Sequence, residues 1–494
     1  KLLFQRCSLG NQNTDLKISK TILFLHRQNS TFKVSNFIQQ LDIKNDSKNS
    51  NFAAVTHEEI KNRTFDVTKI LPPRLDKEMS SKTWNLLYFS LGSLVDFSIP
   101  GYSWNFNPKQ KQLTESRTES GLRRIRGVAG SGKSVVLAKR AVNLISKYPE
   151  KRVLIVCYNI TLVNLLHLMA IKFAKMDRSV SDLRNISFVH FHEWIKDISV
   201  WTNHRQEYKI WNSHSTQSSP KKLKQESEKL VDWIDGTEFE QNMYDAIFVD
   251  EGQDFHLEWW DALKKTLKPG GEMLLVADSN QDLYGRADRW TENQMIGSGF
   301  SGKWVELEHA YRFPQSYYRI LSSFCDYYLE GKSKPLEPSE QRTLFEQLIN
   351  LNFIDLSEFD SDEDGYSEHL MNEISNSITL NSETVLLIPT NNLGKKVIDC
   401  IPTEIDVVET FSGGSKSKHS FTHHHATVKA TTFHSFKGWE ASNLIIIAKK
   451  MRTKTQKRAL YTALTRLKPT QGNSSLTFIS LDKSVTEWWQ SSNF

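Results

Sequence analysis

The sequence predicts an α/β fold in which helices cover both faces of parallel sheets, preceded by an α+β N-terminal region. From about residue 105, short β-branched segments alternate with helical ones, as in RRIRGVAGSGKSVVLAKRAVNLI and YDAIFVDEGQDF. A second alternating block carries SETVLLIPTNN, SNLIIIAKK and SSLTFISL as buried strands. Strands that alternate with helices in this way predict parallel pairing. With 494 residues, the chain is too long for a single core.

The composition is that of an ordinary globular protein, with 38% hydrophobic and 24% charged residues. No apolar run is long enough to span a bilayer and the first residues do not resemble a signal peptide, so we expect a cytoplasmic protein without a membrane partner. The four cysteines form no CxxC pair, which argues against a disulfide framework or structural zinc and fits a reducing compartment. The net charge of +6 is compatible with a nucleic-acid partner but does not establish one.

Two segments offer weak signals for other chemistry. In residues 1–100, a region whose role the sequence does not reveal, Glu59-Ile60-Lys61 matches a tripeptide that metal nucleases place at a strand end, but chance matches to so short a pattern are common. A later stretch is rich in histidine, with His419, His423, His424 and His425. These side chains could ligate a metal, yet they lack Cys or carboxylate partners at ligand spacing, which favours a loop tip.

The segment GVAGSGKS matches the phosphate-binding pattern G-x-x-x-x-G-K-[ST], with a predicted strand before it and a predicted helix after it. Its glycines let backbone N–H groups turn toward phosphate oxygens, and the start of the helix adds positive charge. We expect Lys133 to neutralise the β- and γ-phosphates of ATP and the Ser134 hydroxyl to ligate Mg²⁺. The predicted ATP-binding residues of this loop are Gly127, Val128, Ala129, Gly130, Ser131, Gly132, Lys133 and Ser134.

Two adjacent carboxylates, Asp250 and Glu251, end the apolar strand in YDAIFVDEGQDF. Without further context, a solvated strand end would be the ordinary explanation. Beside a phosphate loop, however, a magnesium nucleotide needs one carboxylate to hold the metal's water shell and a second group to orient or deprotonate the attacking water. A divalent cation also removes the repulsion between the two charges. We therefore assign Asp250 to Mg²⁺ and Glu251 to the water.

From about residue 105 to 470, an ordered series of motifs resembles the UvrD/Rep-like superfamily 1 DNA helicases, in a compact form without a large 2B subdomain. FNPKQKQL resembles the Q motif, GVAGSGKS motif I, VLIVCYN motif Ia, VHFHEW the T-F-H element, DEGQDF motif II and VADSNQDLYG motif III. LEHAYRFP, TTFHSFKGWE and RALYTALTRLK resemble motifs IV, V and VI. The resemblance implies two RecA-like P-loop NTPase domains, at 101–290 and 291–494, with a small helical 1B-type insertion at about 165–240.

The resemblance also implies roles for individual residues. Besides Asp250 and Glu251, the implied catalytic residues are the γ-phosphate sensor Gln281 and the arginine fingers Arg312 and Arg466. Outside the phosphate loop, the implied ATP contacts are Gln110 and Tyr311 at the adenine and Glu440 at the ribose. The implied DNA contacts are Tyr158, Asn159, Phe191, His192, Tyr284, Trp290, Thr432, His434 and Lys437. Aromatic faces of this kind can accept any base, as a translocating enzyme requires.

The chain departs from the family pattern at several positions. His190 stands where Thr is usual, Ala310 replaces an Asn, and Trp439 stands where Leu is common. Motif III continues as YGRADRW in place of the usual aromatic and Arg-Gly-Ala, so Trp290 is equally compatible with stacking on a base and with a core position. Only a Gly/Ser/His stretch precedes motif V, where larger relatives carry a regulatory subdomain, and the resemblance therefore implies a reduced motor.

The implied activity is that of an ATP-dependent DNA helicase or translocase. It would use ATP and Mg²⁺, load on single-stranded or tailed DNA and move 3′ to 5′, in repair, recombination or anti-phage defence. Because reduced motors often act with a nuclease or a defence-complex protein, we expect weak unwinding by the chain alone. Two alternatives stay open. One is a motor for RNA or of opposite polarity; the other is an ATP-gated nucleic-acid-binding switch, or a motor subunit of a nuclease or defence complex, with little unwinding of its own.

Overall fold

In the computed structural model, the chain divides into two compact units, Lys1–Ser98 and Ile99–Phe494. The boundary lies close to the one expected at residue 100. The structure describes Ile22–Leu23, Ala54–Val55 and 106–494, except for 129, 178–182, 214–219, 237–242, 279–299, 301–302, 308–313, 330–333, 336–348, 379–383, 415–416, 419–420, 422–427, 469–473 and 493. In the smaller unit, the described residues form a short parallel pair, β1 (Ile22–Leu23) with β2 (Ala54–Val55). Throughout the described residues, no helix combines the length and the apolar character needed to cross a membrane.

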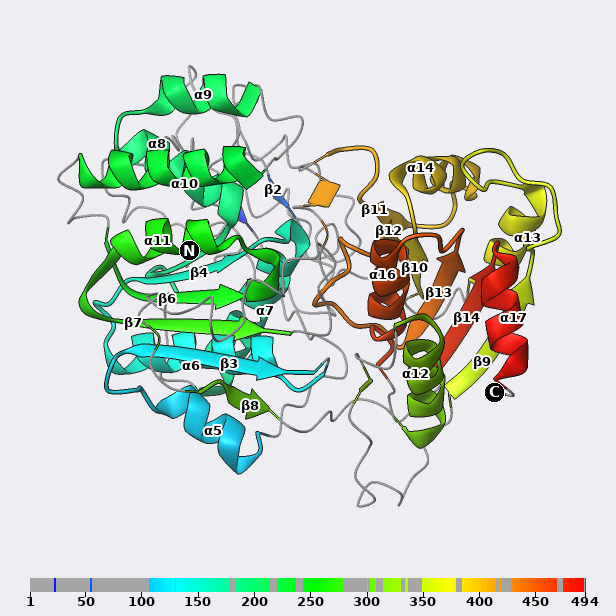
Figure 1. The fold of residues 1–494 in the computed structure, drawn as a ribbon, viewed down its shortest axis with the longest axis horizontal. Coiled ribbons are helices and arrows are strands. Elements are labelled where there is room, and N and C mark those ends of the chain that lie inside the picture. Colours follow the sequence, from blue (N-terminus) through cyan, green and yellow to red (C-terminus); the bar gives the residue numbers. More distant parts are fainter. Residues whose placement is uncertain are drawn as a thin grey trace, which may run out of the picture. The chain divides into compact units, whose positions relative to one another are not determined.

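The first sheet of the larger unit has six parallel strands in the order β5-β4-β6-β7-β3-β8 (Figure 1). These strands are β3 Leu122–Gly127, β4 Val153–Cys157, β5 Ile186–His190, β6 Tyr244–Asp250, β7 Leu267–Ala277 and β8 Val305–Leu307. The helices among them are α5 Pro108–Glu115, α6 Lys133–Lys147, α7 Ile160–Asp177, α8 Phe191–Trp201, α9 Arg205–Ser213, α10 Pro220–Asp235 and α11 Leu257–Lys265. We call this assembly the first lobe.

Both faces of the first sheet are covered, as the unbroken apolar strands predict. In β4, Leu154 and Val156 belong to a core that also contains side chains of α8, α10 and α11. The alternate residues Val153 and Ile155 are buried too, and they point to the opposite face because strand side chains alternate. Helices α6 and α7 pack against the sheet on that face.

The second sheet also has six parallel strands, in the order β11-β12-β10-β13-β14-β9 (Figure 1). They are β9 Ile349–Asp355, β10 Thr384–Ile388, β11 Val407–Glu409, β12 Val428–Thr432, β13 Asn443–Ala448 and β14 Ser474–Ser480. Its helices are α12 Gln315–Tyr328, α13 Glu368–Ser377, α14 Asn391–Cys400, α16 Lys454–Leu464 and α17 Lys483–Ser491. Helices α13 and α14 share a core with one face of this sheet, and α16 and α17 contact β13 and β14. We call this assembly the second lobe. The predicted α/β fold with two parallel sheets is confirmed.

Two of the expected boundaries differ from the structure. The insertion expected at about 165–240 includes β5, which pairs with β4 and therefore belongs to the sheet. The helices inserted between β5 and β6 are α8, α9 and α10. The first lobe also extends past the expected end at 290, because β8 pairs with β3. Three residues of strand are too short to be recognised from periodicity alone.

The strand register aligns the carboxyl ends of three neighbouring strands. Cys157, the last residue of β4, pairs with His190 of β5 on one side and with Asp250 of β6 on the other. The residues that follow these ends therefore leave the sheet at the same edge, where ligands of parallel sheets bind. This register brings the predicted motifs Ia, T-F-H and II together.

Candidate functional site

The phosphate loop joins β3 to α6, as the sequence predicts. Gly130 and Gly132 have φ angles of 77° and 84°, in the left-handed region where glycine is favoured. A Cβ atom on Gly132 would lie 2.8 Å from Nε2 of Gln110, so a larger residue would also collide with that side chain. The loop ends at the N-terminus of α6, where unpaired backbone N–H groups favour an anion.

Lys133 closes the loop on itself. Its Nζ atom donates to the carbonyl oxygens of Gly127 at 2.8 Å and Val128 at 3.0 Å. It also forms an ion pair at 3.1 Å with Oδ2 of Asp278, which lies just after β7 and is 2% exposed. The ammonium is thus held over the loop. A triphosphate could replace its two carbonyl partners with stronger, charged acceptors.

Asp250 is fully buried at the end of β6. Its Oδ1 accepts the backbone N–H of Glu251 at 2.9 Å, while its Oδ2 has no hydrogen-bond partner among the described residues. Burial and, after it, the charge of Glu251 raise the pKa of Asp250 to about 7, whereas the Ser134 hydroxyl acts to lower it. An orphaned, buried carboxylate oxygen beside a hydroxyl fits a divalent cation, since Mg²⁺ binds through one or two carboxylates together with phosphates.

Glu251 adopts a left-handed backbone conformation, with φ of 52°. For a residue other than glycine this costs on the order of 1 kcal/mol, and such strain is concentrated at functional sites. Its Oε2 accepts a hydrogen bond from Nε2 of Gln253, and the Gln253 Oε1 accepts the backbone N–H of Asp278 at 2.9 Å. The carboxylate of Glu251 is therefore held in place by a side chain that is itself fixed.

Positive charges surround Glu251. Burial alone would raise its pKa, but Lys437, Lys133 and Arg466 together with the Gln253 hydrogen bond outweigh burial, and the pKa lies below the usual value. The opposite directions for Asp250 and Glu251 give two neighbouring carboxylates different protonation behaviour, which is typical of sites that move protons.

Lys437 belongs to the second lobe and reaches this cluster. Its Nζ lies 2.9 and 2.8 Å from the two carboxylate oxygens of Asp254, and 3.3 Å from Oε2 of Glu251. The side chains of Lys437 and Asp254 are each 1% exposed. The resemblance implies a DNA contact for Lys437; in the structure its ammonium is instead buried against motif II, so it has no surface to offer a phosphate.

Arg466 and Glu440 also come from the second lobe. Arg466 is 3% exposed, and its guanidinium donates to the carbonyl of Thr462 at 3.0 Å and to the hydroxyl of Thr465 at 2.9 Å. Its charge contributes to lowering the pKa of Glu251. Glu440 lies 4.0 Å from the ammonium of Lys468, with its side chain 15% exposed.

Gln110 links helix α5 to the phosphate loop. Its Nε2 donates to the carbonyl of Ser131 at 2.9 Å, and its Oε1 accepts the backbone N–H of Asn107 at 3.0 Å. Asn107 in turn caps the helix by accepting the N–H of Gln110 at 2.7 Å. This reciprocal cap fixes the amide beside the loop, which is a suitable place for the adenine contact implied by the resemblance.

The two lobes are joined by a set of hydrogen bonds that we call the seam, between 159–164 of the first lobe and 418–439 of the second. Asn159 Nδ2 donates to the carbonyls of His434 at 3.0 Å and Lys437 at 3.3 Å. The buried Trp439 donates from its indole Nε1 to the carbonyl of Thr161 at 3.0 Å. Asn159, implied as a DNA contact, thus holds the motif V loop in this structure.

The aromatic candidates for DNA differ in exposure. Phe191 is 0% exposed, stacked at 4.4 Å between ring centroids on Trp259, so no face of its ring is open to a base. Its implied stacking role is therefore not compatible with this fold. Tyr158 is half-buried, with its ring 5.8 Å from Trp259 and 5.6 Å from the exposed ring of His192. Tyr158 and His192 are the described residues of this group that can present a ring to a base.

The polar candidates of motif V lie at the end of β12, where Thr432 is the last residue, and in the turn that follows it. Thr432 accepts the backbone N–H of Ser435 at 3.2 Å and donates to its hydroxyl at 3.1 Å. Burial, followed by the charges of Lys437 and Lys418, lowers the pKa of His434 to about 4, so its imidazole is neutral near pH 7. Hydrogen bonding to a phosphate stays possible for a neutral imidazole, but charge attraction does not.

Several predicted residues lie outside the described part of the chain. They are Ala129, Gln281, Tyr284, Trp290, Tyr311, Arg312, His419, His423, His424, His425 and the Glu59-Ile60-Lys61 tripeptide. Among the residues that are described, no three His, Cys, Asp or Glu side chains gather as a metal site. Mg²⁺ does not require such a set, because substrate phosphates and waters complete its octahedron.

Three residues of the cluster were not singled out from the sequence: Gln253, Asp254 and Asp278. Asp278 could have been found by the signal that identified Asp250, because LLVAD also ends an apolar strand in a carboxylate. Gln253 and Asp254 lie within motif II, and only their contacts with Asp278 and Lys437 show what they do. Contacts between lobes cannot be read from local sequence.

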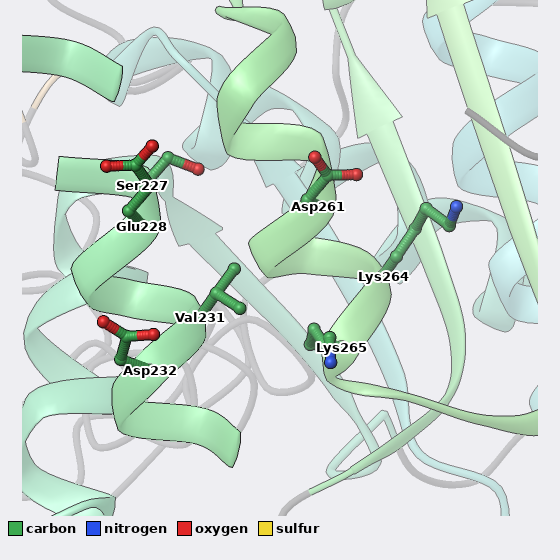
Figure 2. A pocket seen from close by; sticks show the side chains of 7 residues that line it. All are labelled: Ser227, Glu228, Val231, Asp232, Asp261, Lys264 and Lys265. Carbon is green, nitrogen blue, oxygen red and sulfur yellow. The ribbon is translucent and has the colours of Figure 1, made fainter. Parts of the chain in front are cut away.

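A pocket lies on the first lobe between α10 and α11 (Figure 2). Figure 2 shows the lining residues, which are Ser227, Glu228, Val231 and Asp232 on α10 and Asp261, Lys264 and Lys265 on the neighbouring α11. None of these residues belongs to the phosphate loop or the carboxylate cluster. Its lining combines three carboxylates with two lysine ammonium groups, and this mixture does not indicate a particular ligand.

No family model matches the chain, and a search of curated proteins found no match. The function must therefore be inferred from the residues and their geometry.

Proposed function

We propose that the protein is an ATP-dependent DNA helicase or translocase that acts on single-stranded DNA with 3′ to 5′ polarity, in repair, recombination or anti-phage defence. In this proposal the two lobes are RecA-like domains, and α8–α10 form the small 1B-type insertion. One observation carries the proposal: the ammonium of Lys437 in the second lobe lies 3.3 Å from the carboxylate of Glu251, which follows β6 in the first. A nucleotide bound by the loop would then be contacted from both lobes, as a motor requires.

The residues of the first lobe would bind and orient the nucleotide. Lys133 would exchange its carbonyl partners for the β- and γ-phosphates, and the fixed amide of Gln110 would contact the adenine. Ser134 and Asp250 would hold Mg²⁺, which supplies neutralisation of phosphate charge. Their suitability is supported by the orphaned Oδ2 of Asp250.

Hydrolysis would be carried out by Glu251 and Arg466. Glu251 Oε1 has no hydrogen bond to any described residue, so it can accept one from the attacking water while Oε2 stays bound to Gln253. Arg466 supplies a positive charge from the opposite lobe. Arginine fingers of this kind are worth about 10³–10⁵ in rate in related NTPases.

Single-stranded DNA would lie along the edge where the three strand ends coincide. Tyr158 and His192 offer rings there, and Thr432 and His434 offer polar groups from the second lobe. Base stacking is worth about 1–3 kcal/mol per base and tolerates any sequence. The proposal expects this mixed surface to bind DNA with little sequence preference.

ATP hydrolysis measured with single-stranded DNA, duplex DNA and RNA is the direct test. The proposal expects single-stranded DNA to raise turnover manyfold above the rate without nucleic acid. Displacement of strands with 3′ or 5′ tails then decides the polarity. Absence of ATP hydrolysis under all of these conditions would refute the proposal.

A second candidate is an ATP-gated nucleic-acid-binding switch, or a motor subunit of a nuclease or defence complex with little unwinding of its own. The seam favours it, because Asn159 and Trp439 join the two lobes through direct hydrogen bonds. A switch would bind ATP, yet its turnover would hardly respond to single-stranded DNA. The same hydrolysis assay therefore separates the two candidates.

A further inference from the structure

The position of the Lys437 side chain differs from that of a surface contact to DNA. Lys437 is almost completely buried, and it lies on the loop of the second lobe that carries Thr432 and His434, two of the implied DNA contacts. Its ammonium nevertheless ends at the first lobe, between Asp254 and Glu251. A buried ammonium costs free energy unless it is paired, and the bidentate contact with Asp254 supplies the pairing.

The contact with Glu251 adds a geometric constraint. Lys437 Nζ and Gln253 Nε2 both approach Oε2 of Glu251, so one carboxylate oxygen is held from two sides. The other oxygen, Oε1, has no hydrogen bond to a described residue. A carboxylate fixed through one oxygen presents the other in a defined direction, and orientation of this kind contributes strongly to proton abstraction.

The loop that carries Lys437 is itself fixed against the first lobe. Asn159 donates to the carbonyl of Lys437, and Trp439 donates to the carbonyl of Thr161. Gly438, with φ of 86°, lies so close to Leu162 that an added Cβ would be 2.5 Å from its Cδ1 atom. A shift of this loop would therefore move the ammonium relative to Glu251.

We propose that Lys437 is a positioning residue that orients Glu251 for the attacking water and makes turnover depend on the position of the motif V loop. This inference rests on the proposed function. Nucleic acid bound at Thr432 or His434 would act on Glu251 through Lys437. Only two residues, Ser435 and Phe436, separate His434 from Lys437, whose side chain then reaches Glu251.

The test is the Lys437→Met variant, which removes the charge and keeps an unbranched side chain. We expect kcat with saturating single-stranded DNA to fall by about 10²-fold, the size of effect that misorientation causes, while the KM for ATP changes by less than about threefold. Lys437→Arg, which keeps the charge, should retain more activity than Lys437→Met. Lys450→Met is the matched control, because Lys450 is exposed and outside the site; it should behave as the parent protein.

The double variant Lys437→Met with Asp254→Asn distinguishes the positioning of Glu251 from a merely structural role of Lys437. Replacing both partners of a buried pair is far milder than removing one, so this variant should recover thermal stability. If Lys437 only balances the charge of Asp254, the double variant also recovers turnover and the inference is wrong. If Lys437 positions Glu251, turnover stays low although the protein is stable.

Two other outcomes overturn the inference. A Lys437→Met variant with unchanged kcat and weaker, more salt-dependent DNA binding would show that Lys437 contacts a phosphate directly. Unchanged kcat together with unchanged DNA binding would show that the contact with Glu251 has no part in turnover. Failure of the proposed function is distinct, because the parent protein would then hydrolyse no ATP.

Discussion

The buried ion pair between Arg140 of α6 and Glu272 of β7 gives a quantitative prediction. The guanidinium forms two contacts with the carboxylate, at 2.8 and 2.6 Å, and the two side chains are 8% and 9% exposed. It also donates to the carbonyl of Glu115 at 2.9 Å, at the end of the helix that carries Gln110. Arg140 thus holds α6, β7 and the end of α5 together.

Replacing Arg140 with Met leaves the carboxylate of Glu272 buried without its partner. Loss of one member of a buried pair costs about 3–5 kcal/mol. Replacing both Arg140 and Glu272 with Met removes the unpaired charge, so the double variant should lose only about 1–2 kcal/mol, from the backbone carbonyls that lose their donor. The double variant should therefore be more stable than Arg140→Met by about 1–4 kcal/mol.

The free energy of unfolding in urea, followed by tryptophan fluorescence, measures both variants. Lys265→Met is the control, because the Lys265–Asp235 pair has similar contact distance, 2.8 Å, but side chains 46% and 50% exposed. An exposed pair of this kind contributes about 1 kcal/mol or less. The reasoning is refuted if Arg140→Met loses no more stability than Lys265→Met, or if the double variant is no more stable than Arg140→Met.

Three further variants test the candidate site. Glu251→Gln should bind ATP as the parent does and reduce turnover by about 10²–10⁴-fold, the usual contribution of a general base; hydrolysis at the parent rate would show that the base is assigned wrongly. Lys133→Ala should weaken ATP binding, measured with a fluorescent analogue, by about tenfold or more because a charged phosphate contact is lost, and unchanged affinity would argue against the phosphate-loop assignment. Gly438→Ala should cost about 1–3 kcal/mol more than Gly270→Ala, since both have positive φ but only Gly438 lies against Leu162. Equal unfolding free energies for these two alanine variants would mean that the motif V loop is not closely packed on the first lobe.

The sequence allowed the sheet strands and the phosphate loop to be predicted because their signals are local. Apolar runs such as those of β6 and β13, bounded by polar residues, indicate buried strands, and the glycines of the loop mark the turn before α6. Strand β9 was not predicted, although its sequence INLNFID alternates polar and apolar residues as a half-buried strand does; it lies at the edge of the second sheet, where it pairs with β14. Edge strands bury less surface, so their composition is less distinctive.

The assignments that the structure changes depend on contacts between residues that are far apart in the sequence. Phe191 and Lys437 were associated with DNA by motif position, but their burial depends on Trp259 and Asp254, which local patterns do not connect with them. The seam could not be predicted for the same reason, because its hydrogen bonds join residues more than 250 positions apart in the sequence. Motif order indicated which residues gather, and only the packing of the two lobes indicates which of them remain accessible.

The shared register of β5, β4 and β6 has a mechanical consequence. Because adjacent strands are about 4.8 Å apart, His190 and Asp250 lie about 10 Å from each other across a hydrogen-bonded, covered sheet that resists shear. The aromatic rings at the end of β5 and the carboxylates at the end of β6 are therefore attached to the same rigid sheet. In the proposed motor, a change in the spacing between bound DNA and the phosphates of ATP would therefore come from a movement of the second lobe.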